Sequence, residues 1–304
     1  MTLPIRIGTR GSPLALVQAN LVAGALRAVH GLDEAEIEIV AIRTSGDRIQ
    51  DRPLAEVGGK ALWTKELDRA LIAGETDLSV HSMKDVESLR PDALVIAAML
   101  PRADPRDRLI GADRIADLAR AAVVGTSSPR RAAQLLHLRP DLRIVPIRGN
   151  VATRLAKLAA GEVDATLLAA AGLDRLGHAE IGFAIPVDTM LPASAQGAVG
   201  IECRSGDARM AQMCVAINHS TTSLCVSAER ALLAALGGSC HSPAAALAVE
   251  DGDILLRVEI LSEDGRERVQ RSARFAPSDQ ERPRTLAQDL LAGASPALRA
   301  LFAG

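Results

Sequence analysis

Apolar residues recur at every second position in some segments and at every third or fourth position in others, and these two periods predict strands that alternate with helices. Residues 5–8 have the pattern of a strand, and Ser12-Pro13 then supplies a helix N-cap and a first-turn proline. Residues 37–42 alternate as a half-exposed strand. The same patterns predict further strands at 78–82, 94–100, 123–125, 165–168, 198–203, 244–249, 254–261 and 268–275, and helices at 62–74, 208–217, 222–236 and 285–291.

Two parts of the chain resemble each other, which predicts a duplicated architecture. Residues 123–129, Val-Val-Gly-Thr-Ser-Ser-Pro, are similar to residues 7–13, Ile-Gly-Thr-Arg-Gly-Ser-Pro. Later, Gly-Glu-Val-Asp at 161–164 precedes a strand just as Gly-Glu-Thr-Asp does at 74–77. Because both similarities occur in the same order and the same strand, loop and helix context, we expect two alike α/β lobes whose loops face one shared cleft.

The length of 304 residues exceeds the usual single core, so the chain should divide into two or three domains. The prolines and charges of 101–107 are typical of a crossover between lobes, and 191–197 has the pattern of a return crossover. We therefore predict an α/β fold with lobe 1 at 1–100 and 195–217, lobe 2 at 101–194, and a small α+β third domain at 218–304.

Composition favours a soluble, unexported protein. Hydrophobic residues make up 48% of the chain and charged residues 24%, and neither a bilayer-length apolar run nor a leader peptide is expected. Four cysteines without close pairing fit neither a zinc site nor a disulfide scaffold, which indicates a reducing compartment, the cytoplasm. A net charge of −2 and a near absence of aromatic residues argue against nucleic acid as a partner.

Several basic residues stand at the starts of predicted elements rather than along solvated helix faces. Loops between a strand and a helix N-terminus offer backbone N–H groups to anions, and an arginine can grip a carboxylate through two parallel hydrogen bonds. Hydroxyl donors accompany the cations at Thr9, Ser12, Thr126, Ser127 and Ser128. Single surface arginines usually only solvate a fold, but two repeated loops favour a polyanionic ligand. The cations concerned are Arg10, Lys84, Arg130, Arg131, Arg148 and Arg154.

Asp85 lies among these cations at the end of a predicted strand. An ionised carboxylate at that place can stabilise a cation, although a helix cap or a structural ion pair is the commoner role of an aspartate at a strand end. Lys60 and Lys65 flank Trp63 and are candidates for the cleft or for the surface.

Cys240 is the one cysteine that the pattern presents rather than buries. Gly237, Gly238 and Ser239 supply the permissive backbone of a helix end and an exposed loop, and Pro243 prevents the helix from resuming. From the loop alone, a functional thiol and an idle one are both open. The other three cysteines lie in apolar patterns and are expected to pack in the interior: Cys203, Cys214 and Cys225.

The combination of motifs resembles the porphobilinogen deaminase (hydroxymethylbilane synthase) family. The resemblance runs along nearly the whole chain and is least distinctive in the strands of the third domain. It is carried by 80–86 (Val-His-Ser-Met-Lys-Asp-Val), 125–131 (Gly-Thr-Ser-Ser-Pro-Arg-Arg), 148–154 (Arg-Gly-Asn-Val-Ala-Thr-Arg) and the Cys240 loop, with 58–60, 170–177 and 196–204 in support.

This resemblance implies a fold of two lobes similar to type II periplasmic binding proteins, with a third domain. It implies a dipyrromethane cofactor joined by a thioether to Cys240. The similar enzymes condense four porphobilinogen molecules head to tail with release of ammonia, then hydrolyse linear hydroxymethylbilane from the cofactor in tetrapyrrole and haem biosynthesis. We expect this protein to be a monomer. No metal, membrane or nucleic acid is implied as a partner.

Residue by residue, the resemblance assigns the catalytic role to Asp85, which would stabilise the cationic azafulvene formed on ammonia loss and assist proton movement. It assigns carboxylate-binding roles to the cationic and hydroxyl groups of the loops. Lys60 would lie on a mobile loop at 44–60 that yields as the product lengthens. The implied cofactor ligands are Arg10, Ser12, Lys84, Asp85, Thr126, Ser128, Arg130, Arg131, Arg148 and Arg154, and the implied substrate ligands are Arg10, Lys60, Arg148, Arg154 and Arg175.

Four positions depart from the family pattern. Trp63 stands where phenylalanine is common, Glu87 where proline is frequent, and His241-Ser242 follows the loop cysteine. These departures bear on the packing around Trp63 and on the geometry of the cofactor loop. A non-catalytic, two-lobed protein that binds small anions is the alternative function.

Overall fold

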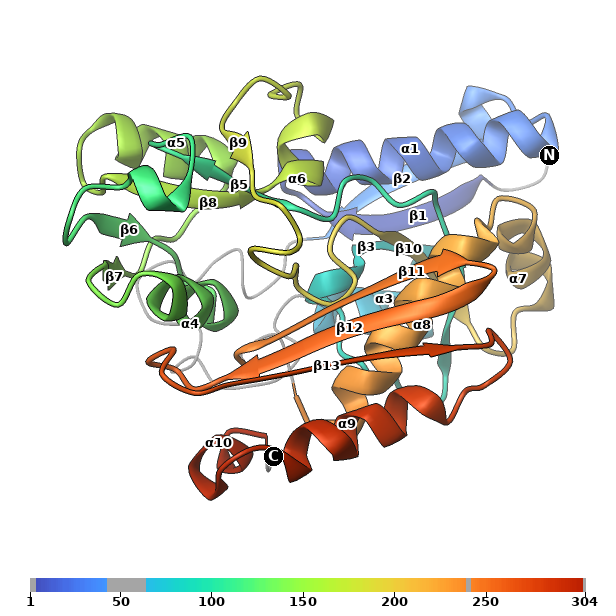
Figure 1. Ribbon diagram of the computed structural model, residues 1–304. Helices are drawn as coiled ribbons and strands as arrows, with labels where there is room; N and C mark the ends of the chain where they lie inside the picture. Colours follow the sequence, from blue (N-terminus) through green and yellow to red (C-terminus); the bar gives the residue numbers. More distant parts are fainter. Residues whose placement is uncertain (1–3, 43–63, 239–241, 303–304) are drawn as a thin grey trace. The chain divides into compact units, whose positions relative to one another are not determined.

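The structure, a computed structural model, describes residues 4–42, 64–238 and 242–302 (Figure 1). The chain forms two compact units, and each is described by itself. Unit 1 comprises residues 1–103 and 198–223, and unit 2 comprises residues 104–197 and 224–304. Unit 1 contains one five-stranded sheet, and unit 2 contains a second five-stranded sheet and a three-stranded sheet.

The sheet of unit 1 has the strand order β2-β1-β3-β10-β4. β1 pairs in parallel with β2 and β3, whereas β10 lies antiparallel between β3 and β4. The predicted return of the chain to lobe 1 is therefore confirmed. The strands are β1 (Ile5–Arg10), β2 (Ile37–Ile42), β3 (Leu78–Ser82), β4 (Leu94–Met99) and β10 (Val199–Arg204).

Helix α1 (Pro13–His30) begins and ends as its sequence requires. Ser12 accepts a hydrogen bond from the N–H of Ala15 at 3.3 Å, and Gly31 ends the helix in the left-handed region at φ +65°. Buried Val22 and Leu26 pack this helix into the core of the sheet. The other helical elements of unit 1 are η1 (Glu34–Glu36), α3 (Lys65–Ile72), η2 (Met83–Asp85) and α7 (Ala208–Val215).

The five-stranded sheet of unit 2 has the strand order β7-β6-β8-β5-β9. β6 pairs in parallel with β7 and β8, whereas β5 lies antiparallel between β8 and β9. This repeats the arrangement of the first sheet, so the predicted duplication is confirmed. The strands are β5 (Asp107–Ile110), β6 (Val123–Gly125), β7 (Arg143–Val145), β8 (Ala165–Ala169) and β9 (Phe183–Ala184), and the helical elements are η3 (Ile115–Asp117), α4 (Pro129–Leu138), α5 (Val151–Ala159) and α6 (Ala170–Arg175).

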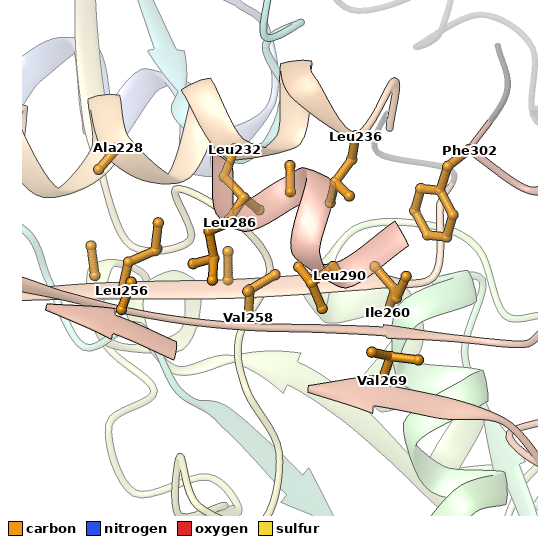
Figure 2. Close-up of a cluster of buried hydrophobic side chains, with 14 of the residues drawn as sticks. Ala228, Leu232, Leu236, Leu256, Val258, Ile260, Val269, Leu286, Leu290 and Phe302 are labelled. Carbon is orange, nitrogen blue, oxygen red and sulfur yellow. The ribbon is translucent and has the colours of Figure 1, made fainter. Parts of the chain in front are cut away.

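The third sheet is an antiparallel meander covered on one face by helices. Figure 2 shows Leu232 and Leu236 of one helix directed toward Leu256 and Val258 of the central strand, with Leu286 packed between them. The elements are α8 (Ser220–Ala235), β11 (Ala244–Asp251), β12 (Asp253–Leu261), β13 (Arg268–Phe275), α9 (Arg282–Ala292) and α10 (Pro296–Ala300).

A turn of this sheet also contacts α4. The N–H of His137 Nδ1 donates to the carbonyl of Gly265 at 2.8 Å. Gly265 has φ +71°, and a Cβ there would lie 2.5 Å from the carbonyl oxygen of Ala133, so only glycine allows this close approach. The three-stranded sheet is thereby attached to the helix that begins with Arg130 and Arg131.

The predicted fold class, two alike α/β lobes with a small α+β addition, is confirmed. Cys203, Cys214 and Cys225 are buried, as expected. The terminal helix α10 was not predicted, and the helix predicted from 62 is described from Lys65. The division into three domains stays a prediction. No helix in the described parts is long and apolar enough to cross a membrane.

Candidate functional site

A pocket in unit 1 brings together three of the predicted site residues. Arg10 ends β1, Ser12 caps α1, and Asp85 ends η2; all three line the same pocket. Lys84 precedes Asp85 and is half-buried. The pocket therefore joins a guanidinium, a hydroxyl and the first turn of a long helix to one carboxylate. Cations and helix N-termini bind anions, and the carboxylate accepts hydrogen bonds from N–H groups. The pocket therefore suits a ligand that carries both carboxylates and N–H groups.

The position of Asp85 is fixed by the elements on either side of η2. The N–H of Met83 donates to the carbonyl of Ala198 at 3.1 Å, and the Met83 side chain is buried against Gly200, where any Cβ would overlap its sulfur. Gln18 of α1 is hydrogen-bonded to Ser82, with 2.8 Å between Nε2 and Oγ. Residues of β10 and α1 thus hold the turn that presents Asp85.

A cluster of charged side chains, termed here the Arg90 cluster, lies in the same unit. It consists of Arg90, Glu202, Asp68, Glu87 and His81. Arg90 Nε and Nη2 donate to the two oxygens of Glu202 at 2.8 and 2.9 Å, Nη2 also donates to Asp68 at 2.5 Å, and Nη1 donates to Glu87 at 2.8 Å. His81 Nε2 lies 3.2 Å from Glu202.

Burial and pairing act in opposite directions on the acids of this cluster. Burial tends to raise the pKa of Glu202, but hydrogen bonds and charge from His81 and Arg90 lower it to about 2. For Asp68 the balance is reversed, because burial raises its pKa and Arg90 offsets only part of that effect. Glu202 is therefore the firmly ionised partner of Arg90.

In unit 2, hydroxyl groups lie where β6 leads into α4. Thr126 is buried and its Oγ1 accepts from the N–H of Ser128 at 3.1 Å. Ser128 caps α4 by accepting from the N–H of Arg131 at 3.4 Å, and Ser127 Oγ donates to the carbonyl of Ile147 at 2.8 Å. The sequence therefore builds the predicted loop and helix start.

Arg148 and Arg154 flank the start of α5. Asn150 caps this helix by accepting from the N–H of Thr153 at 2.9 Å. Arg154 Nε donates to the carbonyl of Gly149 at 3.0 Å. Gly149 has φ +109° and lies close to Thr153, so a side chain at this position would be strained. Both arginines are half-buried at a second helix N-terminus.

Arg130 and Arg131 lie in the interior of unit 2. Their guanidinium groups share the carboxylate of Asp107, with N to O distances of 2.9 Å from Arg130 and 2.6 Å from Arg131. Burial tends to raise the pKa of Asp107, but the two arginines hold it well below its ordinary value. Gln196 of the return crossover donates to the same carboxylate at 2.8 Å. These arginines therefore have a structural partner that the sequence pattern did not reveal.

Arg130 is connected onward to the three-stranded sheet. Its Nη1 donates to Gln134 Oε1 at 2.9 Å, and Gln134 Nε2 in turn donates to Glu259 of β12. Glu259 is buried and also accepts from Arg268 and Gln270. A continuous polar network thus runs from β5 through α4 to β12.

Arg175 is half-buried near the end of the return crossover. Its Nη2 donates to the carbonyl of Gly197 at 2.8 Å, and burial lowers its pKa. Helix α8 is anchored nearby by Glu229, which accepts from the N–H groups of Ala195 at 2.6 Å and Ala248 at 2.7 Å. This helix ends at Ala235, five positions before Cys240 in the sequence. Cys240 and Lys60 themselves lie outside the described residues.

The structure thus groups Arg10, Ser12 and Asp85 in unit 1. In unit 2 it places Thr126, Ser128, Arg148 and Arg154 at helix starts, Arg130 and Arg131 in the interior, and Arg175 at the end of α6. Sequence reasoning missed Asp107, Arg90 and Glu202. The prolines and charges of 101–107 predict only a crossover between lobes, and no local signal pairs Glu202 with Arg90.

The chain is an α/β protein with two duplicated lobes, in which cationic and hydroxyl side chains lie at helix starts. Comparison with families is more specific. Residues 5–212 match the family described as "Porphobilinogen deaminase, dipyromethane cofactor binding domain", and residues 223–293 match "Porphobilinogen deaminase, C-terminal domain". The chain belongs to the porphobilinogen deaminase family, and the first of these regions is its dipyrromethane cofactor-binding domain.

Curated relatives agree with this assignment. The chain is 57% identical over 307 residues to the porphobilinogen deaminase of Sphingopyxis alaskensis, covering 99% of this chain and 97% of the relative. It is 54% identical over 269 residues to that of Paracoccus denitrificans, covering 87% and 86%. It is 48% identical over 282 residues to the chloroplastic enzyme of Oryza sativa subsp. japonica, covering 90% and 78%.

Solved structures that align with the chain include a periplasmic substrate-binding protein of an ABC transporter from Coxiella burnetii. It is 17% identical, covers 74% of this chain and 96% of its own, and has a TM-score of 0.42. The fold assignment rests on the repeated sheet order described above.

Replacing Asp107 by asparagine should strongly destabilise the protein. The variant leaves two buried guanidinium groups without a carboxylate, and breaking a buried ion pair costs about 3–5 kcal/mol. Urea unfolding of the wild type and the variant at neutral pH measures the difference. Asp117→Asn, which removes a solvent-exposed pair with Arg114, is the matched control and should leave the unfolding midpoint unchanged. Equal midpoints for all three proteins would contradict the role of Asp107.

The Glu202 carboxylate should make the stability depend on pH. Because its pKa falls from 4.5 to about 2 on folding, ionised Glu202 contributes on the order of 3 kcal/mol above pH 4.5, and this is lost as pH falls toward 2. The free energy of unfolding of wild type and Glu202→Gln, compared from pH 7 down to pH 3, should therefore converge as the pH falls. Glu75→Gln, at an exposed pair with Arg69, should show no such convergence. A constant difference across the range would refute the assignment.

Proposed function

We propose that this protein is a transferase that condenses four porphobilinogen molecules head to tail with release of ammonia. In this proposal the growing oligopyrrole is built on a covalently bound dipyrromethane primer, and linear hydroxymethylbilane is then hydrolysed from that primer. Membership of the porphobilinogen deaminase family along both matched regions carries this proposal. The pocket that joins Asp85 to Arg10 and Ser12 supports it, because the substrate's acetate and propionate arms require cations and its pyrrole N–H requires an acceptor.

The residues present fit a dipyrromethane group. Arg10 and Ser12 offer donors at the start of α1, and Thr126, Ser128, Arg148 and Arg154 lie at the starts of α4 and α5. In the described structure the Nε atoms of Arg130 and Arg131 are buried without an acceptor, so these side chains keep donor capacity beyond Asp107. We propose that these groups and Lys84 hold the cofactor carboxylates, with Arg10, Lys60, Arg148, Arg154 and Arg175 also binding substrate.

Cys240 is the proposed attachment point of the cofactor through a thioether. The three other cysteines are buried, and burial raises the pKa of Cys203 and, to about 12, that of Cys214, which makes them poor nucleophiles. When bound, the cofactor supplies the pyrrole carbon to which the first substrate is joined. Glu229 positions α8, and hence the helix end that precedes the loop, by its two backbone hydrogen bonds.

Asp85 is the proposed catalytic residue. Its carboxylate would lie beside the pyrrole N–H of the substrate, stabilise the positive charge that develops as ammonia leaves, and accept the proton released when the ring regains aromaticity. Arg10 and Ser12 would orient the substrate by its carboxylate arms. Since binding and charge stabilisation use different groups, loss of Asp85 should affect turnover more than binding.

We propose a monomeric protein of the cytoplasm, acting in tetrapyrrole biosynthesis without a nucleic-acid, membrane or metal partner. A non-catalytic anion-binding protein, the alternative from sequence, is not favoured, because the family match includes the cofactor-binding domain and the C-terminal domain.

The first test is whether Cys240 carries the cofactor. The purified wild type should have an intact mass greater than that of the polypeptide by two linked pyrroles with acetate and propionate arms, and Cys240→Ser should have the polypeptide mass alone. Cys225→Ser, at a buried cysteine, is the control and should keep the added mass. An active wild-type preparation with only the polypeptide mass would exclude a covalent cofactor.

The second test is Asp85→Asn. Loss of a carboxylate that contributes a few kcal/mol in the transition state lowers the rate by roughly two to four powers of ten. We expect that loss in kcat for ammonia release, with the circular dichroism spectrum and the added cofactor mass unchanged. Retention of full activity by this variant would show that Asp85 is not catalytic.

A further inference from the structure

The turn that carries Lys84 and Asp85 is held differently on its two sides. On the upstream side, β3 is paired with both β1 and β10, so η2 begins from the middle of a sheet. On the downstream side, residues 86–93 form an irregular connection to β4, and Leu89 within it is 79% exposed. This connection must be fixed by side-chain contacts if Asp85 is to keep a defined position.

Arg90 makes such contacts to two regular elements. Its guanidinium group binds both oxygens of Glu202 on β10 and one oxygen of Asp68 on α3. It also binds Glu87 within the connection, and Glu87 accepts from Thr64 at the start of α3 with 3.1 Å between the oxygens. The Arg90 side chain is only 8% exposed, and the Glu202 side chain is fully buried. The connection is thus attached to the same strand, β10, that supports Met83 from the other side.

The chemistry of the cluster favours a geometric role over a purely stabilising one. A buried ion pair often stabilises a fold no more than apolar residues of similar volume would, because its charges lose their hydration. What the planar guanidinium adds is direction, since its N–H groups can meet three carboxylates only in one orientation. Lysine has the same charge but lacks the planar, fixed arrangement of N–H donors.

We infer that Arg90 is a positioning residue for Asp85, acting through the short connection between them. The inference rests on the proposed catalytic role of Asp85. Glu202 is the fixed acceptor on the sheet, and Asp68 and Glu87 complete the orientation of the guanidinium group. Errors of about an ångström in a catalytic group can reduce turnover by roughly a hundredfold, so a rigid attachment five positions away has a direct chemical effect.

The test compares Arg90→Met, Arg90→Lys and the double variant Arg90→Met/Glu202→Gln. For Arg90→Met we expect kcat to fall on the order of 10- to 100-fold, KM to change little, and the cofactor mass to remain. Arg90→Lys should recover only part of kcat, because it restores charge without that arrangement of donors. Arg69→Met is the matched control, because Arg69 lies beside Asp68 on α3 and its pair with Glu75 is exposed; this variant should leave kcat unchanged.

The double variant separates positioning from stability. Arg90→Met takes the guanidinium group away from Glu202, the most deeply buried acid of the Arg90 cluster, and Glu202→Gln removes that charge. The temperature of thermal unfolding should therefore return toward the wild-type value while kcat stays low. Wild-type kcat in the double variant, or in Arg90→Met itself, would overturn the inference. If Arg90→Met does not fold, the double variant and Arg90→Lys decide the question by the same criteria.

Asp85→Asn, assayed beside these variants, keeps the two proposals distinguishable. An inactive Asp85→Asn with a fully active Arg90→Met refutes positioning by Arg90 and leaves the proposed catalytic residue intact. A fully active Asp85→Asn refutes the catalytic assignment, and with it the premise on which the role of Arg90 is argued.

Discussion

A carboxylate removed from water must be met by donors, and this requirement fixes the irregular parts of the molecule. Four buried acids illustrate it, each bound by segments far apart in the sequence: Asp107, Glu202, Glu229 and Glu259. Asp107 joins α4 to the return crossover, and Glu229 joins that crossover to α8 and β11. The sheets and helices supply the frame, whereas these acids determine where the connecting segments lie.

Much of the frame could be predicted because its signals are local. Alternation of apolar residues, N-caps such as Ser12 and Ser128, and first-turn prolines each depend on a few neighbouring positions, and the predicted elements formed accordingly. The duplicated sheet order followed from two short repeats. Helix α10 was missed because its five residues are too few to establish a helical period.

The candidate site was predictable only in part. The resemblance placed Arg10, Ser12 and Asp85 in one site, and they line one pocket. Arg130 and Arg131 begin a helix, but a helix start does not reveal which way a long side chain points, and both turn inward to Asp107. Pairing of Glu202 with Arg90 spans more than a hundred residues, and no periodicity records it. The sequence thus identifies candidate site residues, but it does not identify the side chains with which they pair.

The order of strands in the two five-stranded sheets has a consequence for synthesis. In unit 1 the antiparallel strand β10 is the last to be made, and β4 has no other neighbour among the described strands. In unit 2 the corresponding strand, β5, is the first to be made. Because the N-terminus is synthesised first, a nascent chain can pair every strand of the second sheet while the first sheet still has a gap between β3 and β4. The part that holds Asp85 is begun first and closed later.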